Sequence, residues 1–208
     1  MSFVILAKSE TQARRPSFRE WIRDHFPERF KDRIKGCTVT IALDSEPDAV
    51  YDVVIEGDGG SRALFEEIRD TFMDQGAVMT AYSVARMVEK TPPAARLDQV
   101  KLVACLGGDP AVSRIETRRH WNEHVPLALR IHIGASRYLR NWVEGLILTS
   151  EFSPRLYVGI AMMSFHTVED YKERLFDIPE NVKVIRDDMA EFSELRDNFL
   201  GQETLIGW

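Results

Sequence analysis

The chain has 208 residues, a length that suits one large domain or two small ones. Its hydrophobic fraction of 44% and charged fraction of 29% are typical of a soluble globular protein and exclude bulk disorder. The net charge of −6 offers no basic surface of the size that nucleic acid requires, so we expect no nucleic-acid partner.

No stretch of the sequence predicts export or membrane insertion. The apolar run in MSFVILAKSE is too short for a secretory signal and lacks a basic leader and a cleavage site. No run approaches the roughly 18 apolar residues that a membrane span needs. Cys37 and Cys105 stand far apart without metal or redox spacing, which favours two buried thiols in a reducing compartment. We therefore expect a cytoplasmic protein without a membrane partner.

Hydrophobic periodicity predicts the order β-α-β-β-α-β in the first half of the chain. Residues 9–17 are polar and contain Pro16, which predicts a loop, and Pro27 predicts a kink or a restart of the first helix. Gly76 follows the second helix, in the position that a helix stop prefers. The predicted strands are 3–7, 37–43, 51–55 and 77–88, and the predicted helices are 18–34 and 62–75.

The same order returns in the second half, after paired prolines that predict a stiff linker over residues 91–97. Ser113 and Glu116 have the spacing of a capping box, which predicts the start of the long helix. The predicted strands are 100–106, 136–150, 157–165 and 198–208, and the predicted helical segments are 118–133, 168–176 and 181–192.

Each half therefore has the split βαβ arrangement, an antiparallel sheet with its helices on one face. We predict an α+β protein built from two tandem ferredoxin-like units, residues 1–90 and 98–208. The uncovered faces of two such sheets can pack together as an intrachain α/β barrel. Such a duplication makes a monomer viable, and contacts through the outer helices would allow a homodimer.

The two long predicted helices share a motif. FREWIRDHFPERFKDRI at 18–34 and RRHWNEHVPLALRIHI at 118–133 come into register when their His-x-Pro triplets, 25–27 and 124–126, are aligned. The first copy has Trp-x-x-x-His-x-Pro, whereas in the second copy the tryptophan stands only three residues before the histidine. The residues four before the histidines are therefore Trp21 and His120.

The segments that carry a family resemblance are the predicted helix at 118–133, Val100–Val103, Ser136–Asn141, Tyr157–Ile160 and Asp187–Phe192. Over roughly residues 98–208 the chain resembles the EthD family of dimeric α/β-barrel proteins. The first half looks like a diverged copy. The resemblance implies a protein that works without a cofactor, beside aromatic-compound or ether catabolism or polyketide assembly. Relatives look like isomerases, dehydratases or oxygenases, and many have no assigned reaction.

His124 is the first candidate for catalysis, because imidazole is the side chain whose ordinary pKa lies closest to neutrality. The alternative is a histidine that bonds to backbone groups where helix meets sheet. Asn141 is the second candidate, either to orient a carbonyl or the His124 ring, or to cap a strand end. His120 and His124 stand at i and i+4, a spacing that can share a metal, but HWNEH is not the zincin motif, and we predict no metal.

Aromatic side chains and histidines are the candidates for substrate binding. Trp121 and Trp142 could stack on a planar molecule, with core packing as the alternative. The full set of predicted substrate-binding residues is Trp21, His25, His120, Trp121, Tyr138 and Trp142.

Two functions follow from these residues. The first is a cofactor-independent enzyme that acts on a small aromatic, lactone or polyketide-like compound by proton transfer, giving isomerisation, dehydration or cyclisation. The second is a non-catalytic barrel that binds a hydrophobic metabolite or a partner protein of a catabolic pathway. A monooxygenase-like relative is a further alternative.

Overall fold

The computed structural model describes residues 1–91 and 99–206, so most of the predicted linker at 91–97 lies outside the described residues. In chain order the elements are β1 (Ser2–Ser9), a 3-10 turn (Gln12–Arg14), α1 (Arg15–Phe30), β2 (Lys35–Ala42), β3 (Val53–Asp58), α2 (Arg62–Asp74), β4 (Ala77–Lys90), β5 (Gln99–Gly108), α3 (Arg114–Ile131), β6 (Arg137–Thr149), β7 (Gly159–Phe165), α4 (Val168–Arg174), α5 (Asn181–Ala190) and β8 (Ser193–Leu205).

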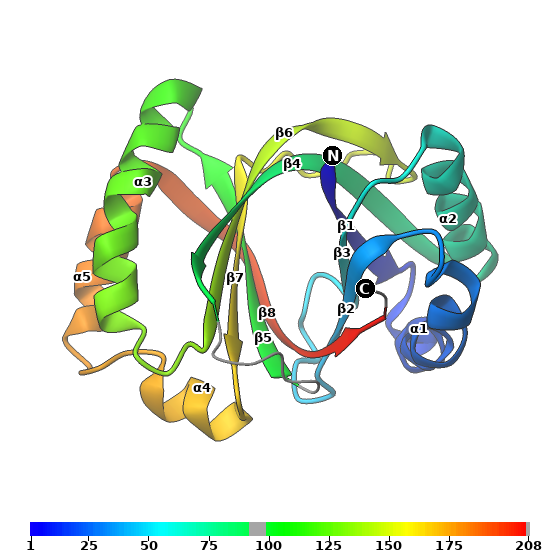
Figure 1. Cartoon of the computed structure of the whole chain (residues 1–208), viewed down its shortest axis with the longest axis horizontal. Helices are drawn as coiled ribbons and strands as arrows, with labels where there is room; N and C mark the ends of the chain where they lie inside the picture. Colours follow the sequence, from blue (N-terminus) through cyan, green and yellow to red (C-terminus); the bar gives the residue numbers. More distant parts are fainter. Residues whose placement is uncertain (92–98, 207–208) are drawn as a thin grey trace. The chain divides into compact units, whose positions relative to one another are not determined.

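Within the described residues, eight strands are hydrogen bonded in the closed order β1-β3-β2-β8-β5-β7-β6-β4 (Figure 1). With five α-helices, this is the α+β barrel of ferredoxin-like type that the sequence predicts. The order β-α-β-β-α-β occurs in Ser2–Lys90 and again in Gln99–Leu205, where α4 and α5 replace a single helix. The division into repeats at 1–90 and 98–208 stays a prediction.

Contacts within the chain define two compact units. The first comprises residues 1–85, 143–155 and 201–208, and the second comprises residues 86–142 and 156–200. No helix in the described part of the chain is both long enough and apolar enough to cross a membrane.

In the first unit, α1 and α2 cover one face of the strands (Figure 1). The alternation Phe3, Ile5 and Ala7 puts every second side chain of β1 into this core. The helices contribute aromatic side chains at helical spacing, and Phe18 and Phe72 meet edge to face with their ring centroids 5.4 Å apart. The intervening residues Val4 and Leu6 are also buried, which accounts for the unbroken apolar run at the N-terminus.

The predicted loop at 9–17 is wrong in its second half, because α1 begins at Arg15 with Pro16 in its first turn. Buried Asp52 explains this early start. Its carboxylate accepts hydrogen bonds from the Ser9 amide at 2.8 Å and from Arg19 Nε at 3.1 Å, and Arg15 Nε lies 3.4 Å away. A buried carboxylate needs such partners, so it draws the first turn of α1 onto the sheet. The helix then continues through Pro27 to Phe30 without restarting.

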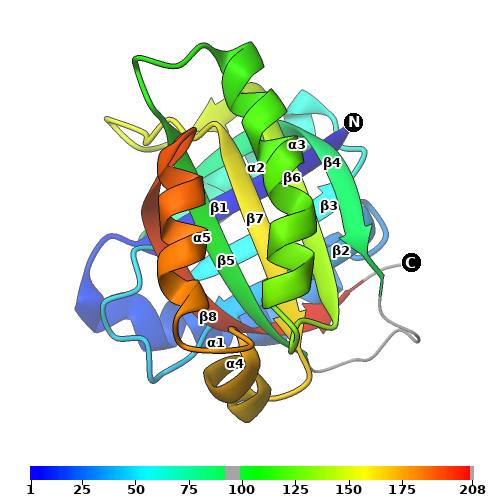
Figure 2. The ribbon, with the colours of Figure 1, turned by 90° about the vertical axis from the view of Figure 1, so that its left-hand side faces the viewer.

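In the second unit, α3 and α5 lie side by side over β5, β7 and β6 (Figure 2). Ser113 caps α3 as predicted, since its Oγ accepts from the Glu116 amide at 3.2 Å. The Glu116 carboxylate does not complete the capping box, because it pairs with Arg119 instead.

Gly159, at the start of β7, makes room for the indole of Trp121. A Cβ placed on this glycine would lie 2.2 Å from Trp121 Cζ3, closer than any two such atoms can approach. Its backbone has no left-handed torsion, so the position requires glycine for space alone. The close approach lets α3 settle directly on β7.

We therefore expect Gly159→Ala to lower the free energy of unfolding by about 1–3 kcal/mol, because the added methyl group overpacks a closed contact. Urea unfolding followed by tryptophan fluorescence measures the loss. Gly145→Ala is the control, since the nearest atom to its added methyl group is Ser83 Oγ at 3.5 Å. Equal stabilities of the two variants would contradict the role of Gly159.

His132 closes the C-terminal end of α3. Its Nδ1 bonds to the Leu175 carbonyl at 2.6 Å, and its ring packs against Phe176 with the centroids 5.4 Å apart. Burial lowers the pKa of the His132 imidazole, and the Leu175 hydrogen bond opposes this only in part. The folded chain therefore prefers the neutral ring.

This shift predicts a pH dependence. Below the unfolded pKa of about 6.5 the unfolded chain binds a proton at His132 more readily than the folded chain does. The stabilisation from the neutral ring is thus complete above that pH and is lost as the pH falls toward the lower folded pKa. Thermal unfolding between pH 5 and pH 8 should show a smaller loss on acidification in His132→Gln than in wild type. The control His25→Gln, at an exposed position, should follow the wild-type curve.

Candidate functional site

His124 lies on α3 and pairs with Asp188 of α5. The imidazole is 4% exposed, and its Nδ1 lies 2.5 Å from Asp188 Oδ2. Because a carboxylate can only accept, Nδ1 carries the hydrogen, and in the neutral ring Nε2 then has the free electron pair. The Asp188 side chain is 40% exposed, so the pair joins a buried ring to a carboxylate that water can reach.

His124 and Asp188 meet because they lie on the facing sides of α3 and α5. Asp188 lies in the last turn of α5, and Phe192 follows in the turn between α5 and β8. The Phe192 ring packs against the His124 ring with the centroids 5.6 Å apart. His124 is therefore held on one side by an aromatic ring and at Nδ1 by a carboxylate.

Trp121 and Trp142 form an aromatic layer between α3 and β6. Their ring centroids are 6.2 Å apart, and both residues are buried. The guanidinium of Arg140 lies over the Trp121 ring at 5.2 Å, and that of Arg114 over the Trp142 ring at 5.0 Å. The two predicted substrate-binding tryptophans thus contact each other and two arginines.

Arg140 is the most highly bonded side chain of this layer. It is 4% exposed, and its Nε and Nη2 both donate to Glu89 Oε1. Nη1 donates to the Trp121 carbonyl at 2.9 Å, and Nη2 also donates to Asn122 Oδ1 at 3.0 Å. This guanidinium joins β4, β6 and α3.

Tyr138 and Asn141 lie on opposite faces of β6. Tyr138 shares the face of Arg140 and Trp142, and burial raises the pKa of its phenol to about 12. Asn141 faces away, is completely buried, donates to Met162 Sδ at 3.6 Å and accepts from Arg86 Nε at 3.3 Å. Among the described residues, Asn141 has no bond to the His124 ring, so the two predicted catalytic residues are not brought together.

The remaining predicted residues lie nearer the surface. His120 is half-buried, and its Nε2 lies 3.0 Å from Arg119 Nη2. In the first unit, His25 is exposed and its ring packs against half-buried Trp21 at 6.1 Å. A role of any of these residues in binding or catalysis stays a prediction.

Sequence reasoning missed Asp188 and Arg140. Asp187, Asp188 and Glu191 have the pattern of a solvated helix face, and Arg140 belongs to a set of arginines that suggests solvated surfaces. A usable signal for Arg140 was its position between Tyr138 and Trp142 on one strand face. No comparable local signal marks Asp188, which lies 64 residues from its partner.

No group of three or more His, Cys, Asp or Glu side chains in the described ranges is arranged to hold a metal ion. Both cysteines are buried, and burial raises the pKa of the Cys37 thiol to about 12, so this thiol stays protonated at neutral pH.

The fold defines an α/β barrel of ferredoxin-like type. Within the chain, residues 109–196, which include His124 and Asp188, match the EthD domain, in agreement with the resemblance seen in the sequence. No curated protein sequence gives a significant match.

Solved structures share the fold along almost the whole chain. An anthrone oxidase-like protein superposes with a TM-score of 0.63 at 10% identity, over 98% of this chain and 90% of the other. A mutant chlorite dismutase from Candidatus Nitrospira defluvii gives 0.57 at 10% identity, over 99% and 91%. A protein from Lactobacillus acidophilus NCFM that is proposed to be a monooxygenase gives 0.56 at 8% identity, over 99% and 96%. At these identities the likeness shows the fold alone.

The buried Arg140–Glu89 pair yields a prediction for stability. Glu89→Leu should lower the free energy of unfolding by about 3–5 kcal/mol, because it leaves a buried guanidinium without its anion. Chemical unfolding measures the loss. The matched control is Glu66→Leu, which removes an exposed partner of Arg62 and should have no measurable effect. A Glu89→Leu variant as stable as the control would show that Asn122 and the Trp121 carbonyl suffice for Arg140.

Proposed function

We propose that this protein is a cofactor-independent enzyme of the EthD type that transfers a proton within a small aromatic, lactone or polyketide-like compound. His124 is the general acid and base. The observation that supports the proposal is the bond between His124 Nδ1 and the Asp188 carboxylate, which fixes the tautomer and the orientation of the imidazole.

The chemistry follows from the tautomer. The free electron pair of Nε2 accepts a proton from a carbon beside a carbonyl group, and the electrons of that C–H bond form an enolate. The imidazolium that results is stabilised by Asp188. Returning the proton to another carbon gives an isomer, and giving it to a departing hydroxyl group gives a dehydrated product and water. Both outcomes balance without an oxidant.

The aromatic layer supports the proposed class of substrate. Trp121, Tyr138 and Trp142 share the surface between α3 and β6, and flat aromatic side chains suit a flat substrate. We propose these three for substrate binding. Asn141 faces the other side of β6 and cannot contact the same molecule, so its predicted role in orienting a carbonyl is not part of this proposal. We also propose that His120, His25 and Trp21 bind the substrate, and only the family motif supports this.

The second candidate function is a non-catalytic barrel that binds a hydrophobic metabolite or a partner protein. The 4% exposure of His124 favours it, because a buried ring held by Asp188 and Phe192 can simply join two helices. For either function we propose a cytoplasmic monomer or homodimer with a small hydrophobic or aromatic ligand and no nucleic-acid or membrane partner. The composition and net charge support this setting.

Hydrogen–deuterium exchange at carbon tests the enzyme without knowledge of the complete reaction. The protein is incubated in D₂O with a panel of aryl ketones, lactones and β-diketones, and loss of each α-proton signal is followed by ¹H NMR. Wild type should accelerate exchange for at least one compound. His124→Asn should lose about 10²–10⁴-fold of that acceleration, the usual contribution of a general base.

Asp188→Asn and His166→Asn complete the experiment. Asp188→Asn should slow the exchange while leaving binding of the compound unchanged, because it removes the group that orients the ring. His166→Asn, at an exposed position without a proposed role, should exchange as wild type does. A panel member that binds to wild type with no exchange, or an exchange that survives in His124→Asn, would reject the enzyme and favour the binding barrel.

A further inference from the structure

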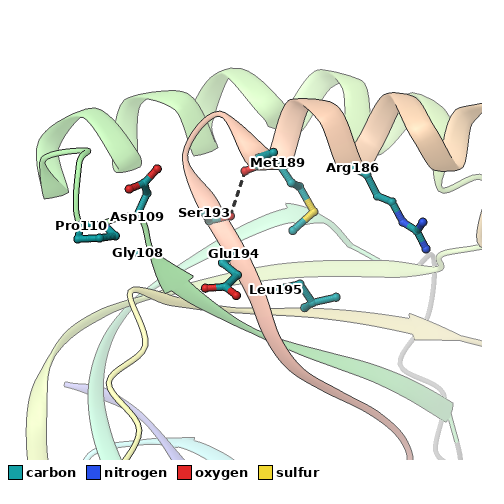
Figure 3. Close-up of a pocket in the computed structure, with 9 residues that line it drawn as sticks. Gly108, Asp109, Pro110, Arg186, Met189, Ser193, Glu194 and Leu195 are labelled. Atoms are coloured by element: carbon teal, nitrogen blue, oxygen red, sulfur yellow. Dashed lines mark hydrogen bonds between the residues drawn. The ribbon is translucent and has the colours of Figure 1, made fainter.

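The second unit has a cavity of about 610 Å³ between the end of β5, α5 and the start of β8 (Figure 3). This volume lies within the range of small-molecule sites, about 300–1,000 Å³. Asp109 and Pro110 stand at one end of the cavity, and Arg186 stands at the other (Figure 3). None of the residues predicted from sequence lines it.

The cavity and the His124 pair use different faces of α5. Arg186, Met189 and Ala190 line the cavity and recur at the spacing of one helical face. At about 100° per residue, Asp188, which bonds His124, lies about 160° around the helix from Arg186 and Ala190 and about 100° from Met189. The cavity is therefore a separate feature of the EthD segment.

The charged residues that line the cavity differ in whether they have a bonding partner. The Asp109 carboxylate accepts from the Ala111 amide at 2.8 Å, and Glu194 Oε2 lies 3.7 Å from Arg196 Nε. Arg186, by contrast, has neither a hydrogen bond nor an ion pair with any residue that the structure describes. Among the described residues, Arg186 is thus a guanidinium without a carboxylate partner at one end of the cavity, while Asp109 keeps its negative charge at the other end.

An apolar surface adjoins that charge. The side chains of Met189 and Arg186 both extend from α5 toward β8, where Leu195 lies (Figure 3). Leu195 is 47% exposed although it is a large apolar residue, so covering it would remove apolar surface from water. Methionine adapts its shape to different apolar partners.

We propose that this cavity binds an apolar organic anion, a molecule with one carboxylate or sulfonate at the end of an aromatic or aliphatic body. The anionic group pairs with the planar guanidinium of Arg186, which suits two-point recognition of such groups. The body lies on Met189 and Leu195. Asp109 and Glu194 disfavour a second anionic group at the far end, which restricts the ligand to a single terminal charge.

Two fluorescent probes with one ring system test the charge. These are 8-anilinonaphthalene-1-sulfonate, an anion, and N-phenyl-1-naphthylamine, which lacks the sulfonate. In titrations of the full chain, wild type should bind the anion about tenfold more tightly than the neutral probe. Arg186→Gln should remove this preference and leave the affinity for the neutral probe unchanged. Arg186→Lys, which keeps the charge without the planar fork, should fall between them.

The location is tested by ¹³C NMR of methionine methyl groups, with Met189→Leu used to assign the Met189 signal. This signal should shift on addition of the anionic probe. Arg23→Gln, an exposed arginine on α1, is the matched control and should keep the wild-type affinities. His124→Asn should also keep them, so this proposal and the proposed proton transfer fail separately. Equal affinities of the two probes for wild type, an unchanged preference in Arg186→Gln, or a stationary Met189 signal would each overturn the proposal.

Discussion

The second unit depends on one buried charge, the guanidinium of Arg140. At 4% exposure it is tolerated only because Glu89 neutralises it and because α3 supplies two oxygen acceptors. Pro126 lacks the N–H that would bond to the Asn122 carbonyl, and Arg140 donates to the neighbouring carbonyl of Trp121. Pro126, the proline of the family motif, thus lies about one turn after Trp121, where Arg140 of β6 bonds to the backbone of α3. Strands β4 and β6 and helix α3 must keep their positions together for this charge to stay paired.

This constraint determines where the two motif residues of α3 point. With α3 held on the sheet, Trp121 reaches Gly159 of β7, and His124, three residues later, faces α5. In the first unit the spacing is four, and the Trp21 and His25 rings contact each other at 6.1 Å. In the second unit the tryptophan and the histidine have different partners. Trp121 packs against the sheet, while His124 gains a carboxylate partner.

Features that depend on local periodicity could be predicted from the sequence. The strand β1 and the cap at Ser113 are examples, because a run of strand-forming residues marks the first and the spacing of Ser113 and Glu116 marks the second. The errors have a different origin. Asp52 causes α1 to begin early through its bond to Arg19, which lies 33 residues away in the chain. Asp188 has the sequence pattern of a surface carboxylate, and its bond to His124 forms only when α3 and α5 pack together. The space required by Trp121 explains Gly159, and a single sequence gives no sign of a contact between a strand and a helix so far apart.

Helix α5 links structure and chemistry. It has ten residues and buries only Ile185 among them, so it is too short to be stable by its own propensity and needs contacts with its neighbours. The bond from Asp188 to His124 is one such contact, and Phe192, two residues after the helix, packs on the same ring. A structural role and a catalytic role for His124 do not exclude each other, because they use different nitrogens. Nδ1 can hold α5 through Asp188 while Nε2 exchanges a proton, and the protonated ring would bind the Asp188 carboxylate more strongly than the neutral ring does.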